Sequence, residues 1–222
     1  MTGDRSPVAG NAPVIAISRL EALTDGVFAI SITLLAIEIG VPLITSDSGT
    51  DLFEAVLDQW PQYAAYAVTF SLIGAYWINH HRMFNLLSGV NHKFLLLNIL
   101  FLMVIAFIPF PNAVVGEYLL DADLRGVAAG VYGVVMLALA GVFNAVWWYA
   151  RSAGLFSRDC DPAEVTKVCR SYIVGPVAYG VGLAFTFVAP IVALAIFVLV
   201  PVGYFFEGPI GDIQRGYAAS DT

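Results

Sequence analysis

"SRLEALTDGVFAISITLLAIEI", residues 18–39, is an apolar run that gathers three charges at its start: Arg19, Glu21 and Asp25. About 20 apolar residues in a helix cross the roughly 30 Å hydrocarbon core of a bilayer. The segment is therefore long enough to span a membrane if Arg19 lies at one interface and Glu38 at the other. We predict that it forms the first membrane-spanning helix of the chain.

The charges at the start of this helix need partners. Ser18 followed by Glu21 fits a capping box, which predicts that the helix begins at Arg19. Asp25 follows about two turns later, where a carboxylate costs on the order of 2.5 kcal/mol if it lies well inside the hydrocarbon. Either Asp25 is solvated at the interface while Arg19 reaches lipid headgroups, or both side chains find partners on another helix or subunit.

The rest of the chain has the composition of a polytopic membrane protein. Of its 222 residues, 59% are hydrophobic and 12% are charged, and the mean hydropathy is +0.80. The uncharged stretch 171–206 is long enough for two crossings and contains Pro190 near its midpoint, where a helix is easily broken. We predict an all-α protein with a six-helix transmembrane domain over residues 18–206. The predicted spans are 19–43, 57–81, 94–113, 126–150, 170–188 and 190–206.

The distribution of basic residues predicts the orientation. Nine of the ten Lys and Arg residues fall on one side of a six-span arrangement, and only Arg125 falls on the other. Positively charged loops stay on the cytoplasmic side. We therefore predict a multi-pass protein of the cell membrane, with flexible cytoplasmic tails at 1–17 and 207–222.

Charge and motif content exclude several classes of protein. The net charge of −7 argues against nucleic-acid binding, which requires a basic surface. Cys160 and Cys169 lie in a predicted cytoplasmic loop and are expected to be reduced. His80 and His81 are adjacent, so on a helix they point about 100° apart and cannot chelate one ion together. Phosphate loops, zinc-spaced Cys pairs and serine elbows do not occur, and we predict no metal, no cofactor and no enzyme activity.

Polar residues recur on the cytoplasmic side of the next two spans. "YWINHHRMF", residues 76–84, ends the second span, and Asn98 lies inside the third. We expect His80 and His81 to hydrogen-bond to Asp25 or to a helix end, with Trp77 packing near the interface as aromatic belts do.

Two other motifs have structural explanations. Pro109 and Pro111, at the exit of the third span, are expected to end or kink the helix. "VGY", residues 202–204, lacks the Thr before it and the Gly after it that a potassium filter loop requires. We therefore predict no filter loop.

Two stripes follow the first predicted helix at 100° per residue. One is apolar and the other is polar, and both cannot face lipid comfortably. Periodicity alone favours the polar stripe as the water-facing one. The apolar stripe is Ile30, Leu34 and Ile37, with Thr33 at its edge, and the polar stripe is Thr24, Ser31 and Glu38.

Three stretches resemble the bacterial branch of the transmembrane protein 175 family, which are noncanonical potassium channels. They are "RLEALTDGVFAISITLLAIEI" from Arg19, "WINHHRMF" from Trp77 and "LLLNILFLMVIAFIPFPNAVV" from Leu95. The first-helix signature of the family is Arg, three residues, then Phe-Ser-Asp. Arg19 and Asp25 match it, whereas Leu23 and Thr24 replace Phe and Ser. The resemblance covers about the first half of the chain.

The resemblance implies a homotetramer in the bacterial plasma membrane, with the first helix of each subunit lining a central pore. It assigns the hydrophobic constriction to Ile30, Leu34 and Ile37 and an influence on ion preference to Thr33. It thereby favours the apolar stripe as the pore surface, where a ring of aliphatic side chains can gate ions by dewetting. Ser31 and Glu38 would then face neighbouring helices or the outer vestibule. The implied inter-helix polar network is Arg19, Thr24, Asp25, His80, His81 and Asn98.

The function that follows is that of a potassium-permeable cation channel, with monovalent cations and the lipid bilayer as its partners. A secondary transporter or proton-coupled cation exchanger is the alternative, although such proteins usually show internal repeats and no convincing repeat occurs here. A membrane enzyme that uses the His80 and His81 pair is a third possibility.

Overall fold

The computed structural model describes residues 17–42 and 49–206. Within these ranges the regular structure is helical, apart from a single antiparallel bridge between Leu87 and Phe156. The all-α prediction is therefore confirmed for this part of the chain. The helices are α1 (Ile17–Ile37), α2 (Gly49–Asp58), α3 (Trp60–Asn85), α4 (His92–Phe107), α5 (Pro109–Tyr118), α6 (Arg125–Ser152), α7 (Pro162–Ser171), α8 (Val174–Phe185) and α9 (Pro190–Phe206).

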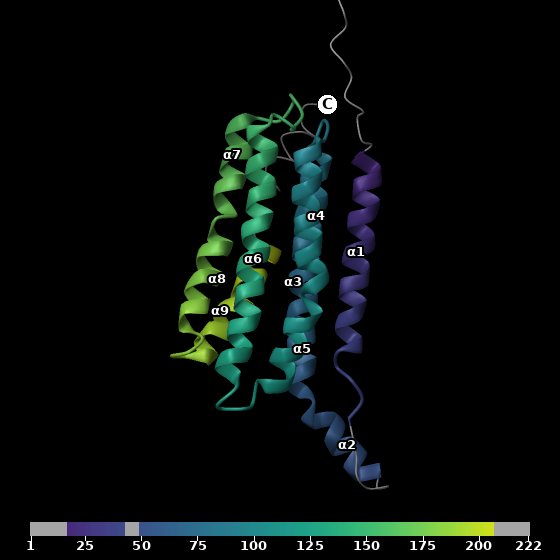
Figure 1. The fold of residues 1–222 in the computed structure, drawn as a ribbon, viewed down its shortest axis with the longest axis vertical. Coiled ribbons are helices and arrows are strands. Elements are labelled where there is room, and N and C mark those ends of the chain that lie inside the picture. The colour runs from purple at the N-terminus through teal and green to yellow at the C-terminus, as the bar shows by residue number, and fades with distance from the viewer. Residues whose placement is uncertain (1–16, 43–48, 207–222) are drawn as a thin grey trace, which may run out of the picture.

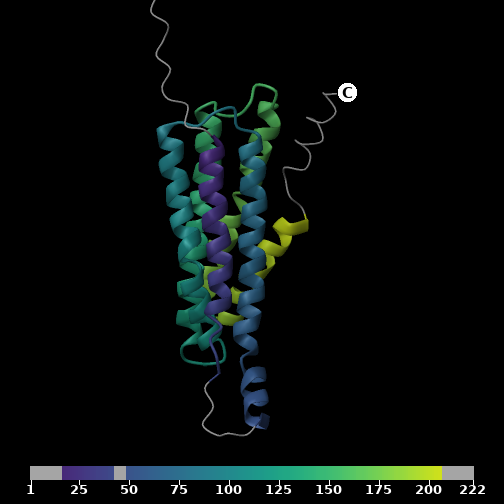
Figure 2. The same cartoon turned by 90° about the vertical axis from the view of Figure 1, so that its right-hand side faces the viewer.

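The long helices run side by side along one axis (Figure 1). Helix α5 continues the line of α4, α8 continues that of α7, and α2 projects beyond one end of the bundle, which we call the α2 end. The opposite end is where α1 begins and α3 and α6 finish. Helix α1 forms one edge of the bundle, with α7 and α8 at the other edge. Figure 2 shows α1 lying alongside both α3 and α4.

Four segments of the described chain are long and apolar enough to cross a membrane: Ile17–Ile37, His92–Tyr118, Arg125–Ser152 and Pro162–Phe185. Helix α3 corresponds to the predicted span 57–81 and α9 to the predicted span 190–206, but neither is among those four. The six-span count therefore stays a prediction. The predicted tails lie outside the described residues, apart from Ile17.

Helix α1 differs at both ends from its prediction. It begins at Ile17, so Ser18 lies inside the first turn rather than at the N-cap position. It ends at Ile37, several residues before the predicted end of the span at Leu43, a residue outside the described ranges. Gly40 has a φ of +69°, the left-handed conformation that commonly terminates helices and that glycine adopts without strain.

Proline explains the break between α4 and α5. Pro109 has no N–H, so it cannot bond to the carbonyl of Ile105, which accepts from Ile108 N at 3.2 Å instead. Ile108 keeps helical dihedral angles, with φ −56° and ψ −37°. The helix is therefore interrupted at Ile108 but continues to Tyr118.

Glycines allow α8 and α9 to approach α6 closely. A Cβ added at Gly182 would lie 2.4 Å from Phe197 Cε1, and one added at Gly133 would lie 2.7 Å from Phe197 Cζ. Phe197 is 1% exposed. The ring of Phe197 therefore fills the space that the two missing side chains leave.

Candidate functional site

Helix α1 packs on the bundle through one narrow face. Its buried residues, Leu20, Thr24, Phe28, Ser31 and Leu35, follow each other at spacings of three or four. That spacing places them on one side of a helix, which here packs against α3, α4 and α5. The larger part of the helix surface is left uncovered by the other residues that the structure describes.

The apolar stripe lies on the uncovered surface. Ile30, Leu34 and Ile37 are 61%, 36% and 70% exposed, respectively. Thr33 is also exposed, and its Oγ1 donates to the carbonyl of Ile30 at 2.8 Å. A row of large aliphatic side chains that the described part of the chain leaves exposed is a surface for lipid or for another protein chain.

The polar stripe does not form a water-facing surface. Thr24 and Ser31 are each 1% exposed, and Ser31 Oγ donates to the carbonyl of Val27 at 2.8 Å. Glu38 is exposed at the end of α1. The water-facing role that periodicity alone favours is therefore wrong for Thr24 and Ser31, because both hydroxyls are buried and bond within the protein, Thr24 to α4 and Ser31 to its own helix.

A buried chain of hydrogen bonds joins α1, α4 and α3. Asn98 Nδ2 donates to Thr24 Oγ1 at 3.2 Å, and Asn98 Oδ1 lies 2.8 Å from His80 Nε2. Because Oδ1 can only accept, His80 Nε2 carries the hydrogen. The His80 ring stacks on Phe101, with centroids 5.2 Å apart and planes at 4°. The Asn98 amide of α4 thus links α1 to α3.

A second set of contacts joins α1 to α3 near the surface. Trp77 Nε1 donates to Asp25 Oδ1 at 2.8 Å, and His81 Nδ1 lies 3.1 Å from Glu21 Oε1. The rings of Trp77 and His81 stack, with centroids 5.7 Å apart. The expected hydrogen bond from His80 or His81 to Asp25 is therefore wrong. Trp77 is the donor to Asp25, and His81 pairs one turn away with Glu21.

The structure brings together five of the six residues of the predicted polar network, in these two sets. Arg19 is exposed and makes no hydrogen bond or ion pair to any described residue. Glu21 and Trp77 were not predicted as members. The spacing of these residues in the sequence could have indicated their membership. Glu21 and Asp25 are four residues apart, as are Trp77 and His81, so each pair lies on one helix face.

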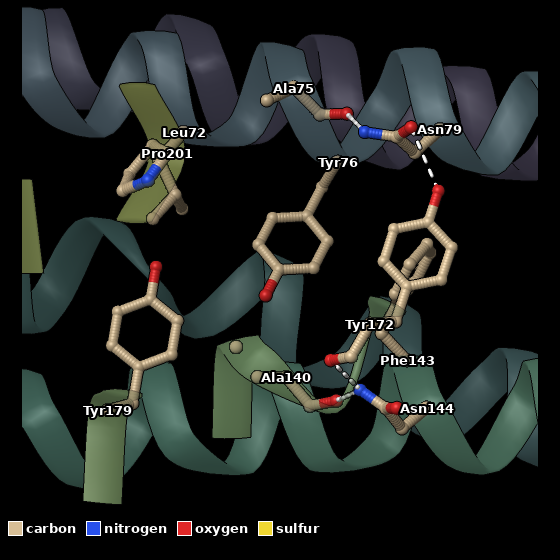
Figure 3. Close-up of a pocket in the computed structure, with 11 residues that line it drawn as sticks. Leu72, Ala75, Tyr76, Asn79, Ala140, Phe143, Asn144, Tyr172, Tyr179 and Pro201 are labelled. Atoms are coloured by element: carbon tan, nitrogen blue, oxygen red, sulfur yellow. Dashed lines mark hydrogen bonds between the residues drawn. The ribbon is translucent and has the colours of Figure 1, made fainter. Parts of the chain in front are cut away.

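A further polar cluster that sequence reasoning missed ties the second half of the chain to the first (Figure 3). Tyr172 OH donates to Asn79 Oδ1 at 2.9 Å, and Asn144 Nδ2 donates to the Tyr172 carbonyl at 2.9 Å. These groups line a cavity of about 20 Å³ between α3, α6, α8 and α9. The cluster fixes the junction of α7 and α8 against α3 and α6.

The described residues contain no group of three or more His, Cys, Asp or Glu side chains placed to hold a metal ion. His80 and His81 point to different partners, as their adjacency requires. Cys160 and Cys169 are free thiols, and both are buried.

The first half of the chain carries the match to a known family. The family described as "Endosomal/lysosomal potassium channel TMEM175" matches residues 19–109, from the first turn of α1 to the first residue of α5. A potassium channel of Streptomyces collinus is 40% identical over 192 residues, which are 85% of this chain and 91% of that relative. The chain belongs to the TMEM175 family.

Other TMEM175 relatives extend the likeness over the second half. A potassium channel of Chamaesiphon minutus is 42% identical over 172 residues, 77% of this chain and 84% of that relative. The crystal structure of a lysosomal potassium-selective channel TMEM175 homolog from Chamaesiphon minutus has a TM-score of 0.77 and 36% identity, and covers 86% of this chain and 97% of its own. The family and these relatives are ion channels rather than enzymes, which removes the membrane-enzyme alternative.

Proposed function

We propose that this chain is the subunit of a potassium-permeable cation channel, in which four copies surround a pore lined by α1. Relatives named as potassium channels support the permeant ion. The observation that carries the proposal is the uncovered row of Ile30, Leu34 and Ile37 on a helix at the edge of the bundle (Figure 1). The proposal includes six spans per subunit, both termini in the cytoplasm and a location in a bacterial plasma membrane.

The proposed constriction works by dehydration rather than by a filter loop. Four copies of an aliphatic side chain around a narrow axis offer an ion no replacement for its water, so the pore can empty and block conduction. The hydroxyl of Thr33 donates to the Ile30 carbonyl, which leaves the lone pairs of its oxygen available to a passing cation. We assign Thr33 an influence on ion preference for that reason.

The two polar sets act as the anchor of the proposed pore helix. Rotation of α1 by one residue position, about 100°, would carry Ile30 away from the axis. The bond from Asn98 to Thr24 attaches α1 to α4, and the bond from Trp77 to Asp25 attaches it to α3. Attachment to two neighbours restricts both rotation and sliding of the helix, so the anchor keeps the constriction in register.

The test is cation flux through the purified full-length protein in liposomes. Ile30→Ala should widen the constriction and raise potassium flux severalfold, with weaker discrimination against sodium. Ile191→Ala is the matched control, because Ile191 is 67% exposed on α9 and outside the proposed pore. Equal flux in the wild type and Ile30→Ala would reject Ile30 as a constriction residue.

A further inference from the structure

A second cavity lies between α3, α5, α6 and α9, away from α1. It has a volume of about 130 Å³, and the described residues give it an entirely apolar surface. Ala65 and Val68 line it from α3, Val115 lines it from α5, and Leu194 and Phe197 line it from α9.

The polar residues around this cavity contribute no polar surface to it. Thr69 Oγ1 and Tyr132 OH bond to each other at 3.0 Å and are buried. Asn112 also lines the cavity, and its Oδ1 is buried without a hydrogen-bond partner, so it could offer a water molecule one partner at most. A water molecule needs two to four polar partners to occupy a buried site. The cavity is therefore a poor site for water and a favourable site for hydrocarbon.

The mouth of the cavity faces outward between α3 and α9. Ala64 and Val198 line the cavity and are themselves exposed, and α9, which contacts α3, crosses behind it in Figure 2. Leu199, next to the mouth, is 65% exposed. The cavity thus opens onto the apolar outer surface of a membrane protein.

Aromatic residues indicate the depth of the mouth. Trp60 and Tyr63, at the start of α3, are 52% and 38% exposed. Exposed Trp and Tyr mark the interface between membrane and water. Ala64 and Val68 follow Trp60 by four and eight residues, which places them about 6–12 Å further along the helix. The tail of a lipid in the adjoining leaflet reaches that depth.

We propose that this cavity binds the hydrocarbon tail of a membrane lipid from the leaflet at the α2 end. The volume is close to that of an engineered cavity of about 150 Å³ that stays dry and binds benzene, so it holds a chain segment of about six carbons. The site uses none of the residues assigned to the pore, and the proposal stands independently of it.

The experiment uses the full-length protein in phosphatidylcholine liposomes that contain a phospholipid with a diazirine in its acyl chain. After illumination, mass spectrometry locates the lipid adducts. We expect more adducts on Ala64, Val68 and Val198 than on Val134. Val134 is an apolar residue of α6 that is 55% exposed and does not line the cavity.

Ala65→Phe fills the cavity and should reduce these adducts by roughly tenfold, as expected when about two methylene groups lose their contact. Ala67→Phe is the matched control, because Ala67 is exposed on the same helix and does not line the cavity. Val198→Phe at the mouth serves as a second variant if Ala65→Phe does not fold. Adducts no more frequent than at Val134, or unchanged by both filling variants, would overturn the proposal.

Discussion

Trp77 on α3 donates its indole hydrogen to the carboxylate of Asp25 on α1, across 2.8 Å. One turn away His81 meets Glu21. Moving four residues forward on α1, from Glu21 to Asp25, corresponds to moving four residues back on α3, from His81 to Trp77. The two contacts therefore lie one turn apart along the interface of two antiparallel helices. Together they define a single register of α1 against α3.

We predict that Trp77→Phe destabilises the protein, because it removes the indole donor together with part of the ring that stacks on His81. Hydrogen bonds between membrane helices average about 0.6 kcal/mol and reach about 1.7 kcal/mol, so the expected loss is about 0.5–1.5 kcal/mol. Unfolding in mixed detergent measures it, with Trp60→Phe as the control at an exposed tryptophan. A double-mutant cycle with Asp25→Ala should return a coupling of the same size, and zero coupling would show that the bond contributes nothing.

Asn98→Leu should destabilise the protein more than a substitution at Thr24 or His80, the two ends of the buried chain of hydrogen bonds. The substitution leaves the buried Thr24 hydroxyl and His80 Nε2 without the partner that both share. An unsatisfied buried polar group costs about 1–3 kcal/mol, so Asn98→Leu should exceed Thr24→Val, which removes one end only. Thermal unfolding of the purified protein ranks the variants. The reverse order would mean that Asn98 is not the centre of the network.

Gly182→Ala should destabilise the packing of α8 on α9. The new Cβ would lie 2.4 Å from Phe197 Cε1, so the buried ring must move, and overpacking of this kind costs about 1–3 kcal/mol. Gly180→Ala is the matched control two residues away, where nothing lies within 4 Å. It should be neutral or slightly stabilising because alanine favours the helix. Phe197→Leu should rescue Gly182→Ala when thermal unfolding is measured, and a lack of difference between the two alanine variants would contradict this packing.

The thiol of Cys160, in the segment between α6 and α7, should react slowly with iodoacetamide at neutral pH. Burial, followed by the negative charge of Asp159, raises the pKa of Cys160 above its ordinary value of 9.0. The thiolate is the reactive form, so alkylation of Cys169→Ser protein should be slower in the native state than in denaturant. The two rates should converge as the pH rises through the native pKa. Equal rates at pH 7.5 would show that the loop does not bury this thiol.

The sequence predicts the helices well but predicts their partners only in part. The sequence leaves open whether Asp25 is solvated at the interface or has a partner on another helix or subunit, and the identity of a partner depends on the register between α1 and α3. An indole near the interface can pack in an aromatic belt or donate a hydrogen bond to another helix. Composition does not decide which of these Trp77 does. Tyr172 and Asn79 bond across 93 residues of separation, a pairing that depends on how the packing of α7 and α8 on α6 places the junction between them.

The choice between the two stripes of α1 shows a different limit. Alternation of polar and apolar residues predicts which side of a helix meets water in a soluble protein. In a membrane-spanning bundle a hydroxyl such as that of Ser31 can bond to its own helix and be buried. Polarity then marks the side that faces other helices, and the exposed apolar stripe is left for lipid or for a partner subunit.

The most direct test of the proposed pore is access of a cation to single cysteines on α1. Replacing Cys160 and Cys169 by serine removes both native thiols, and Ile30→Cys or Ile37→Cys then adds one. Silver ion is monovalent, resembles potassium in size and binds thiolates, so we predict that it blocks potassium current irreversibly in both variants. It should leave Ile191→Cys on α9 unaffected. Current that survives silver at Ile30 and Ile37, or that is blocked equally at Ile191, would contradict a pore lined by α1.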